Sequence, residues 1–165
     1  GRTVGRMNAI TTVDRGPRVV ARRVTVNAPA EELFALVGDP HKHGLLDGSG
    51  TVRHNVKGPS ALTTGAKFTT AMRMYGVPYR ITCTVTEHVD SPERKVVEWA
   101  HPAGHRWRWE FTPTPDGQTE VIESFDNSRS KLGRFFEKVG VADQNAASIT
   151  KTLSGLAARY GGAAG

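Results

Sequence analysis

The stretch KFTTAMRMYGVPYRITCTVT, residues 67–86, alternates apolar and polar side chains on both sides of a central glycine. Such alternation is typical of a β-hairpin that is wet on one face only. We take Gly76-Val77 as a two-residue loop, because glycine at the first loop position tolerates a positive φ. This loop predicts the pairs Met74 with Tyr79, Met72 with Ile81, Thr70 with Cys83 and Phe68 with Val85. The polar reverse face then carries Lys67, Thr69, Arg73, Arg80, Thr82, Thr84, Thr86 and His88.

The residues before this hairpin predict a strand, two short helices and a second strand. The first strand covers residues 18–26 and is rich in valine. A helix follows, since Pro29 suits its first turn, two glutamates complement its dipole, and Gly38 with Asp39-Pro40 ends it. A second short helix over residues 41–46 leads, through a turn at Asp47-Gly48, to a strand over residues 51–56.

Three further strands are predicted after the hairpin, over residues 95–100, 105–112 and 119–125. A tight turn centred near Ala103 sets Trp99 opposite Trp107 and Val97 opposite Trp109, so that both pairs join the apolar face. Asp116-Gly117 is the next turn, and its length decides which side chains of the last strand point inward. We prefer the longer loop, which turns Val121, Glu123 and Phe125 inward, because it buries the phenylalanine.

Apolar residues recur at helical spacing over residues 130–160, which predicts a long amphipathic C-terminal helix with a kink or break at Gly140. Seven strands at about 4.8 Å make a sheet roughly 30 Å wide, whereas one helix covers only about 10–12 Å. The sheet must therefore curl around the helix, and a curled sheet that grips one helix leaves an apolar cleft of the kind that small ligands occupy. The stripe consists of Leu132, Phe135, Phe136, Val139, Ala142, Ala146, Ile149, Leu153, Leu156 and Tyr160.

The positive charge is concentrated at the start of the chain. The 165 residues carry a formal net charge of +6, and residues 1–23 hold six arginines against the single acid Asp14. From Val24 onward 16 basic residues face 15 acidic ones, so we expect a nearly neutral folded body without a basic stripe for nucleic acid. We divide the chain into a flexible tail over residues 1–16 and one domain over residues 17–161.

The start of the chain has no targeting signal that we recognise. Met7 is a candidate native start, which would make residues 1–6 an upstream extension or a cloning remnant. No apolar run has the length of a signal peptide or a membrane span, so the sequence predicts a cytoplasmic protein without integral membrane association. Cys83 lies within the apolar series and is predicted to be a small buried hydrophobe rather than a nucleophile.

The order of strand, two short helices, six strands and long helix resembles the helix-grip fold of the START-like (SRPBCC) superfamily, and specifically its polyketide cyclase, dehydrase and lipid-transport group. The residues that carry this resemblance are 24–34 (VTVNAPAEELF), Gly38-Asp39-Pro40, 107–109 with 115–119, and 149–156 (ITKTLSGL). The resemblance implies an α+β fold in which a curved seven-stranded antiparallel sheet wraps around the C-terminal helix. It does not select an activity, because cyclases, hydrolases, lipid carriers and hormone receptors share the fold.

The sequence therefore predicts a small hydrophobic ligand, such as a lipid, a fatty acyl chain or an aromatic polyketide, between the sheet and the C-terminal helix. The tryptophans are either an aromatic wall for that ligand or core filling. We expect a monomer or a homodimer. The predicted ligand-binding residues are Phe68, Met72, Met74, Tyr79, Ile81, Val85, Trp99, Trp107, Trp109, Phe125, Phe136 and Ile149.

An enzymatic alternative remains open, in which a pocket histidine or glutamate moves a proton in a cyclase or dehydrase reaction. His101 and His105 flank one turn, and Glu87 and Glu123 are candidates for inward carboxylates. A third alternative is an interaction module whose arginine-rich tail meets an acidic partner or a membrane surface. We assign no catalytic residue.

No cofactor or metal site is predicted. His41 and His43 lack further ligands at suitable spacing, which favours histidines of a surface loop over a zinc site. The glycines of residues 48–50 lack the third glycine of a dinucleotide fingerprint, and no phosphate loop or nucleophile elbow is present.

Overall fold

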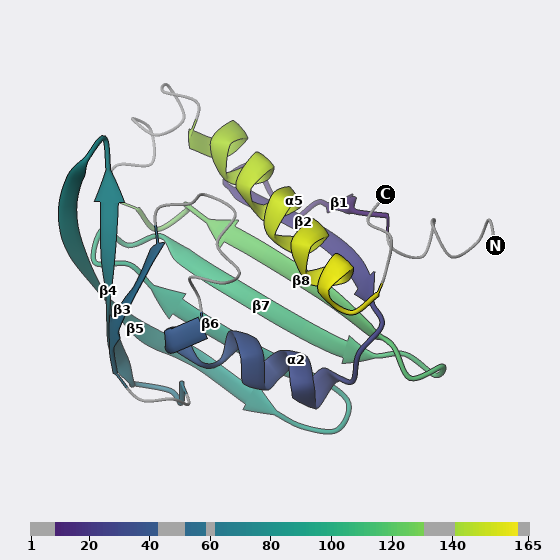
Figure 1. The fold of residues 1–165 in the computed structure, drawn as a ribbon. Coiled ribbons are helices and arrows are strands. Elements are labelled where there is room, and N and C mark those ends of the chain that lie inside the picture. Colours follow the sequence, from purple (N-terminus) through teal and green to yellow (C-terminus); the bar gives the residue numbers. More distant parts are fainter. Residues whose placement is uncertain (1–8, 43–51, 59–61, 131–140, 162–165) are drawn as a thin grey trace.

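The computed structural model describes residues 9–42, 52–58, 62–130 and 141–161. One antiparallel sheet carries two helices on the same face, which confirms the α+β helix-grip arrangement (Figure 1). The strands lie in the order β1-β2-β8-β7-β6-β5-β4-β3. Their bounds are Thr11–Val13 (β1), Val19–Val26 (β2), Val52–Lys57 (β3), Lys67–Met74 (β4), Val77–Asp90 (β5), Lys95–Ala100 (β6), Arg106–Pro113 (β7) and Thr119–Asp126 (β8).

The sheet has eight strands rather than the seven predicted. The additional strand, β1, pairs antiparallel with β2 and sets Thr11 opposite Arg23 and Val13 opposite Ala21. It lies within residues 1–16, which the sequence analysis assigned to a tail. Three residues are too few to show an alternation of side chains, and backbone pairing with the edge of β2 rather than a sequence pattern makes this strand.

The turn between β4 and β5 lies one residue earlier than predicted. Tyr75 and Gly76 form the loop with φ values of 52° and 78°, as a type I′ turn requires. The predicted pairs were therefore wrong by two residues, because Val77 stays in the extended strand instead of entering the loop. A shift of two preserves the face of every side chain. The observed pairs are Met74 with Val77, Met72 with Tyr79, Thr70 with Ile81 and Phe68 with Cys83.

A β-bulge divides β5 into two halves. Val85 lies opposite Trp99, but Glu87 lies opposite Glu98, so β5 contains one extra residue at Thr86. A slip of one residue turns each following side chain to the other face. The inward orientation predicted for Glu87 was therefore wrong, and so was the outward orientation of His88.

Two helices cover the concave face of the sheet. Helix α2, Ala30–Val37, follows Pro29 and ends where the Gly38 N–H donates to the carbonyl of Phe34 at 2.7 Å. It packs on β6 and β7, whereas the C-terminal helix α5, Val141–Arg159, packs on β2 and β8 (Figure 1). Helix α5 therefore does not cover the sheet alone, because the apolar side of α2 packs on a different part of the same face.

Each helix contributes its apolar side to one core. Helix α2 buries Leu33, Leu36 and Val37, while α5 buries Ile149, Leu153, Leu156 and Ala157. The predicted second short helix is a 3₁₀ turn, η1, at Pro40–Lys42, and residues 43–51 lie outside the described part. Residues 131–140, which include Leu132, Phe135, Phe136, Val139 and Gly140, also lie outside it. Among the described helices, none is long and apolar enough to span a membrane.

Candidate functional site

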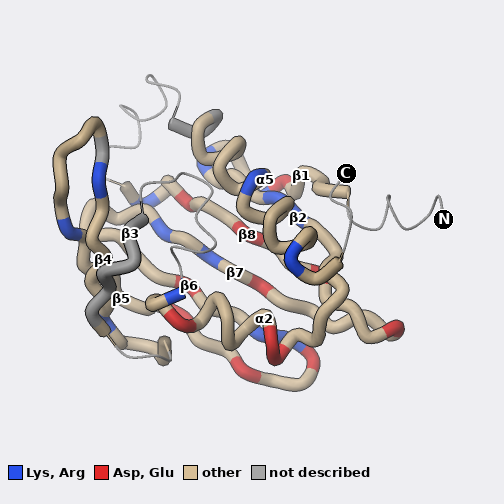
Figure 2. The backbone as a smooth tube through the Cα atoms, viewed as in Figure 1, with Lys and Arg blue, Asp and Glu red and all other residues tan. Residues whose placement is uncertain are grey.

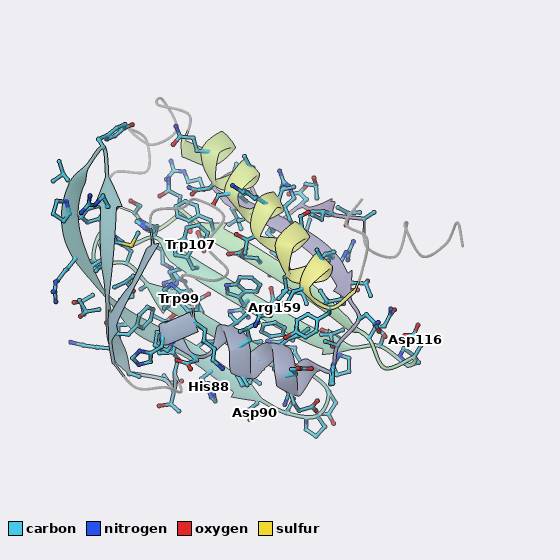
Figure 3. All side chains as sticks on the ribbon, viewed as in Figure 1. His88, Asp90, Trp99, Trp107, Asp116 and Arg159 are labelled. Atoms are coloured by element: carbon cyan, nitrogen blue, oxygen red, sulfur yellow. The ribbon has the colours of Figure 1, made fainter. Side chains whose placement is uncertain are left out.

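The concave face between α2 and α5 carries most of the aromatic side chains. Register places Trp99 opposite Trp107 and Val97 opposite Trp109, as predicted. Phe125 lies opposite Trp107 on the other neighbour, β8. Figure 3 shows Trp99 and Trp107 on the side of the sheet that the helices cover. The predicted orientation of these side chains is therefore confirmed. Short loops fix both the register of the paired strands and the face to which each side chain points.

These rings pack against one another in two clusters. Near the β6–β7 turn, Trp107 meets Phe125 edge to face with ring centroids 4.8 Å apart, and His105 lies 5.1 Å from Phe125. Trp99 meets Phe68 of β4 at 5.7 Å, also edge to face. Such contacts stabilise a core and at the same time form a rigid aromatic surface.

At the other end of the concave face, Phe34 of α2 packs against side chains of the sheet. Its ring lies 6.0 Å from Phe111 and 5.3 Å from His88, and the ammonium group of Lys95 lies 5.7 Å above its centroid. Lys95 is buried and pairs with Asp90. This contact of His88 was not predicted, because the β-bulge reverses the orientation of the side chain and no local sequence signal marks the bulge.

The β6–β7 turn stacks two histidine rings. The rings of His101 and His105 lie 4.1 Å apart and nearly parallel, and Nδ1 of His101 accepts a hydrogen bond from the N–H of Ala103 at 2.9 Å. Burial, assisted by the positive charge that His101 can carry, lowers the pKa of His105 to about 4. Burial also lowers the pKa of His101. Both rings are therefore neutral at neutral pH, so this pair does not supply an imidazolium acid, and His105 is a weak base.

Glu123 of β8 points to the concave face, which confirms the preferred parity of that strand. It is 6 % exposed, and its register partners are Arg22 of β2 and Trp109 of β7. Val121 and Phe125 flank it along β8, and both are buried. A carboxylate and a guanidinium thus share an apolar surface, which is a common setting for a functional acid or base.

Arg22 of β2 was not predicted as a site residue, because its charge belongs to the arginine-rich start of the chain. The signal was present, since Val20, Arg22, Val24 and Val26 share one face of β2 and three of the four are valines. A charged residue inside an apolar series of this kind has a structural or functional reason to be there.

Glu87 lies outside the concave face. Its carboxylate accepts a hydrogen bond from Arg108, which holds the pKa of Glu87 below its usual value. Arg108 also contacts Glu98 at 3.2 Å, and Arg106 contacts Glu98 at 3.1 Å. These residues form an ion-pair network on the convex face, so Glu87 belongs to the stability of the sheet rather than to a site.

The twelve predicted ligand-binding residues differ in how much surface they leave available. Six belong to the buried core: Phe68, Val85, Trp99, Trp109, Phe125 and Ile149. Four are partly exposed: Met72, Tyr79, Ile81 and Trp107. The side chain of Met74 and all of Phe136 lie outside the described part of the chain. The role of all twelve residues in ligand binding stays a prediction.

Among the described residues, no group of three or more His, Cys, Asp or Glu side chains is arranged to hold a metal ion. His41 is exposed, and its Nε2 lies 2.9 Å from the carbonyl of Gly58. His43 lies outside the described part.

Comparison with known proteins agrees with the fold. Residues 17–161 match the model of the family described as polyketide cyclase / dehydrase and lipid transport. An uncharacterised protein of Mycobacterium tuberculosis is 49% identical over 160 residues, which span 94% of this chain and 70% of that protein. A second M. tuberculosis strain holds a relative with the same identity and coverage.

Solved structures of low sequence identity share the architecture. A hypothetical protein of Helicobacter pylori superposes with a TM-score of 0.67 at 13% identity, covering 91% of this chain and 98% of that one. A polyketide cyclase-like protein of Corynebacterium glutamicum gives 0.58 at 20% identity, covering 90% and 92%. With a curved sheet, a C-terminal helix and a family match over residues 17–161 in place, the chain belongs to the polyketide cyclase/dehydrase and lipid-transport family of the START-like (SRPBCC) superfamily.

Proposed function

We propose that this protein binds a small hydrophobic molecule on the concave face of its sheet. The observation that carries the proposal is the set of four partly exposed apolar side chains, Met72, Tyr79, Ile81 and Trp107, beside a rigid aromatic core. A fully buried side chain has no surface left to lose to a ligand, whereas these four do. The family description, which names lipid transport, supports the same class of ligand.

The ligand proposed is largely apolar, such as a lipid, a fatty acyl chain or an aromatic polyketide. Neutral His101 and His105 lie next to Phe125 and hence near Trp107, so a ligand there would meet no charge from them at neutral pH. Arg22 and Glu123 lie side by side on this face, away from the charged Lys95 beside Phe34, and Arg22 is suited to orient a carboxylate or phenolate on the ligand.

Native mass spectrometry of freshly purified protein tests this proposal. We expect a mass above that of the polypeptide which disappears on denaturation, and organic extraction should yield a molecule that is mostly hydrocarbon or polycyclic aromatic. A protein without bound molecules that also takes up none from a mixture of fatty acids, sterols and polycyclic aromatics would contradict it.

A cyclase or dehydrase activity is the second candidate, and the burial of Glu123 beside Arg22 favours it. In this reading, the ligand surface folds a reactive chain and Glu123 takes or gives a proton. Glu123→Gln would abolish turnover of an added polyketide substrate while leaving its binding intact. Equal loss of binding and turnover would assign Glu123 to structure instead.

A further inference from the structure

The β4–β5 hairpin has a charge pattern unlike that of the rest of the sheet. The segment from Gly48 to Thr86 contains five lysines and arginines and not one aspartate or glutamate. Figure 2 shows the upper part of β4 and β5 marked with basic but not with acidic residues. The nearly neutral total after Val24 therefore conceals a local excess of positive charge in this segment.

The basic residues of this hairpin share its convex face. Arg73 lies opposite Pro78, and Arg80 lies opposite Ala71, so the two arginines are diagonal neighbours at about 7–8 Å. Lys67 lies on the same face, opposite Thr84. All three are exposed, and none forms an ion pair with a carboxylate in the described part of the chain.

The central strands treat their arginines differently. Arg106 and Arg108 lie on the same convex face, yet both are paired with Glu98. Within the described residues, the arginines of the central strands are thus paired with carboxylates, whereas Arg73 and Arg80 of the hairpin are not. The exposed guanidinium groups of Arg73 and Arg80 are therefore available to a partner that supplies negative charge.

The tip of the hairpin is apolar and fully open to solvent. Tyr75 is 98% exposed and Val77 is 62% exposed, and they are the exposed large hydrophobic residues found among the described ones. Tyrosine favours the boundary between water and lipid, because its ring is apolar and its hydroxyl is polar. An apolar tip with a basic flank is the arrangement by which peripheral proteins enter the headgroup region of an anionic bilayer.

We propose that the β4–β5 hairpin docks this protein on an anionic membrane surface. Tyr75 and Val77 enter the headgroup region, while Lys67, Arg73 and Arg80 contact the lipid phosphates and carboxylates. Three charges on one short face do not make the extended track that a nucleic acid backbone requires, and Tyr75 is the one ring at the tip on which a base could stack, whereas successive bases need several aromatic platforms. This docking surface consists of the tip and the convex face of the hairpin. It does not depend on any ligand of the concave face.

Vesicle cosedimentation of the full chain tests the proposal, with phosphatidylcholine alone or mixed with phosphatidylserine, at low and at high salt. We expect binding to the anionic vesicles only, weakened by salt. Arg73→Gln/Arg80→Gln should lower the partition coefficient roughly thirtyfold, since each basic residue near such a surface contributes about 1 kcal/mol. Tyr75→Ser/Val77→Ser should weaken binding at both salt concentrations, because it removes apolar contact rather than charge.

Matched variants separate this surface from other sources of charge. Lys42→Gln/Lys151→Gln removes two exposed positive charges elsewhere and should leave binding unchanged, and Arg73→Lys/Arg80→Lys should retain it. Equal losses in both glutamine pairs, or a loss confined to Arg2→Gln/Arg6→Gln in the N-terminal segment, would overturn the proposal. So would tighter binding to a single-stranded oligonucleotide that depends on Arg73 and Arg80 but not on Tyr75. Far-ultraviolet circular dichroism confirms that each variant is folded.

Discussion

Val85 and Glu87 lie on opposite faces of the sheet, although only Thr86 separates them in β5. Val85 is 1% exposed within the core, whereas the carboxylate of Glu87 pairs with Arg108 on the convex face. The bulge therefore divides β5 into two halves whose side chains have different roles. Before it, β5 presents an apolar concave surface to the proposed ligand; after it, β5 supports the ion-pair network and sends His88 against α2.

The convex network should depend on Glu98 more than on Glu87. The side chain of Glu98 is 12% exposed and accepts hydrogen bonds from Arg106, Arg108 and the hydroxyl of Thr86. Glu98→Gln should lower the free energy of unfolding by about 2–3 kcal/mol, because it leaves the half-buried guanidinium of Arg106 without its charged partner and removes one of the carboxylates that Arg108 contacts. Glu87→Gln, at a more exposed position, should cost under about 1 kcal/mol. Urea unfolding measures both, and equal costs would contradict the central place given to Glu98.

Stability should fall as the pH falls through the range in which free histidine becomes protonated. The folded protein resists protonation of His105 down to about pH 4, whereas the unfolded chain takes up the proton near 6.5, the ordinary pKa of histidine. The unfolded state therefore binds more protons between these values, and the free energy of unfolding decreases as the pH falls from about 6.5 towards 4.

His105→Phe keeps an aromatic ring beside Phe125 and should flatten this dependence between pH 6.5 and 5. Because His105 is partly exposed, we expect its contribution to be about 1–2 kcal/mol over the whole window. Urea unfolding at a series of pH values gives the two slopes. Identical slopes for the wild type and the variant would show that His105 does not carry the effect.

Cys83 should be unreactive in the native state. Burial raises the pKa of its thiol to about 12, and the side chain lies in the core opposite Phe68. A thiol reagent should label it only as fast as the protein unfolds. Cys83→Asp should cost more than about 3 kcal/mol by burying a charge, whereas Thr82→Asp, on the exposed face of the same strand, should cost about 1 kcal/mol or less. Rapid stoichiometric labelling in native buffer would be inconsistent with this placement.

The C-terminal helix should be indispensable to the fold. Leu153 is fully buried between α5 and the sheet, so Leu153→Ala should lower the free energy of unfolding by about 2–5 kcal/mol. Lys151→Ala, on the exposed side of the same helix, should change it by about 0.5 kcal/mol or less. Truncation after Gly140 should give an aggregating or molten chain, as judged by near-ultraviolet circular dichroism. A monomeric, cooperatively unfolding truncation would contradict this role of α5.

Sequence patterns predicted this fold well where short turns fix the geometry. The loop around Ala103 set the Trp99–Trp107 pair correctly, and burial of Phe125 selected the right parity for β8. The strand β1 was not predicted, because it forms through backbone pairing with β2 and not through a pattern of side chains. The orientations of Glu87 and His88 escaped because the extra residue at Thr86 has no signature in the alternation of threonines and apolar residues around it.

The central claim is that the partly exposed apolar side chains of the concave face bind a hydrophobic molecule, and tryptophan emission tests it most directly. Titration with a fatty acid, a sterol and a polycyclic aromatic should give a saturable change for at least one of them, largely insensitive to salt because burial drives it. Met72→Lys should abolish the change, whereas Thr82→Lys, on the convex face of the paired strand, should preserve it, with native circular dichroism for both. No saturable change with any of the three probes, or an equal response in the two variants, would contradict the claim and leave these aromatic residues as core alone.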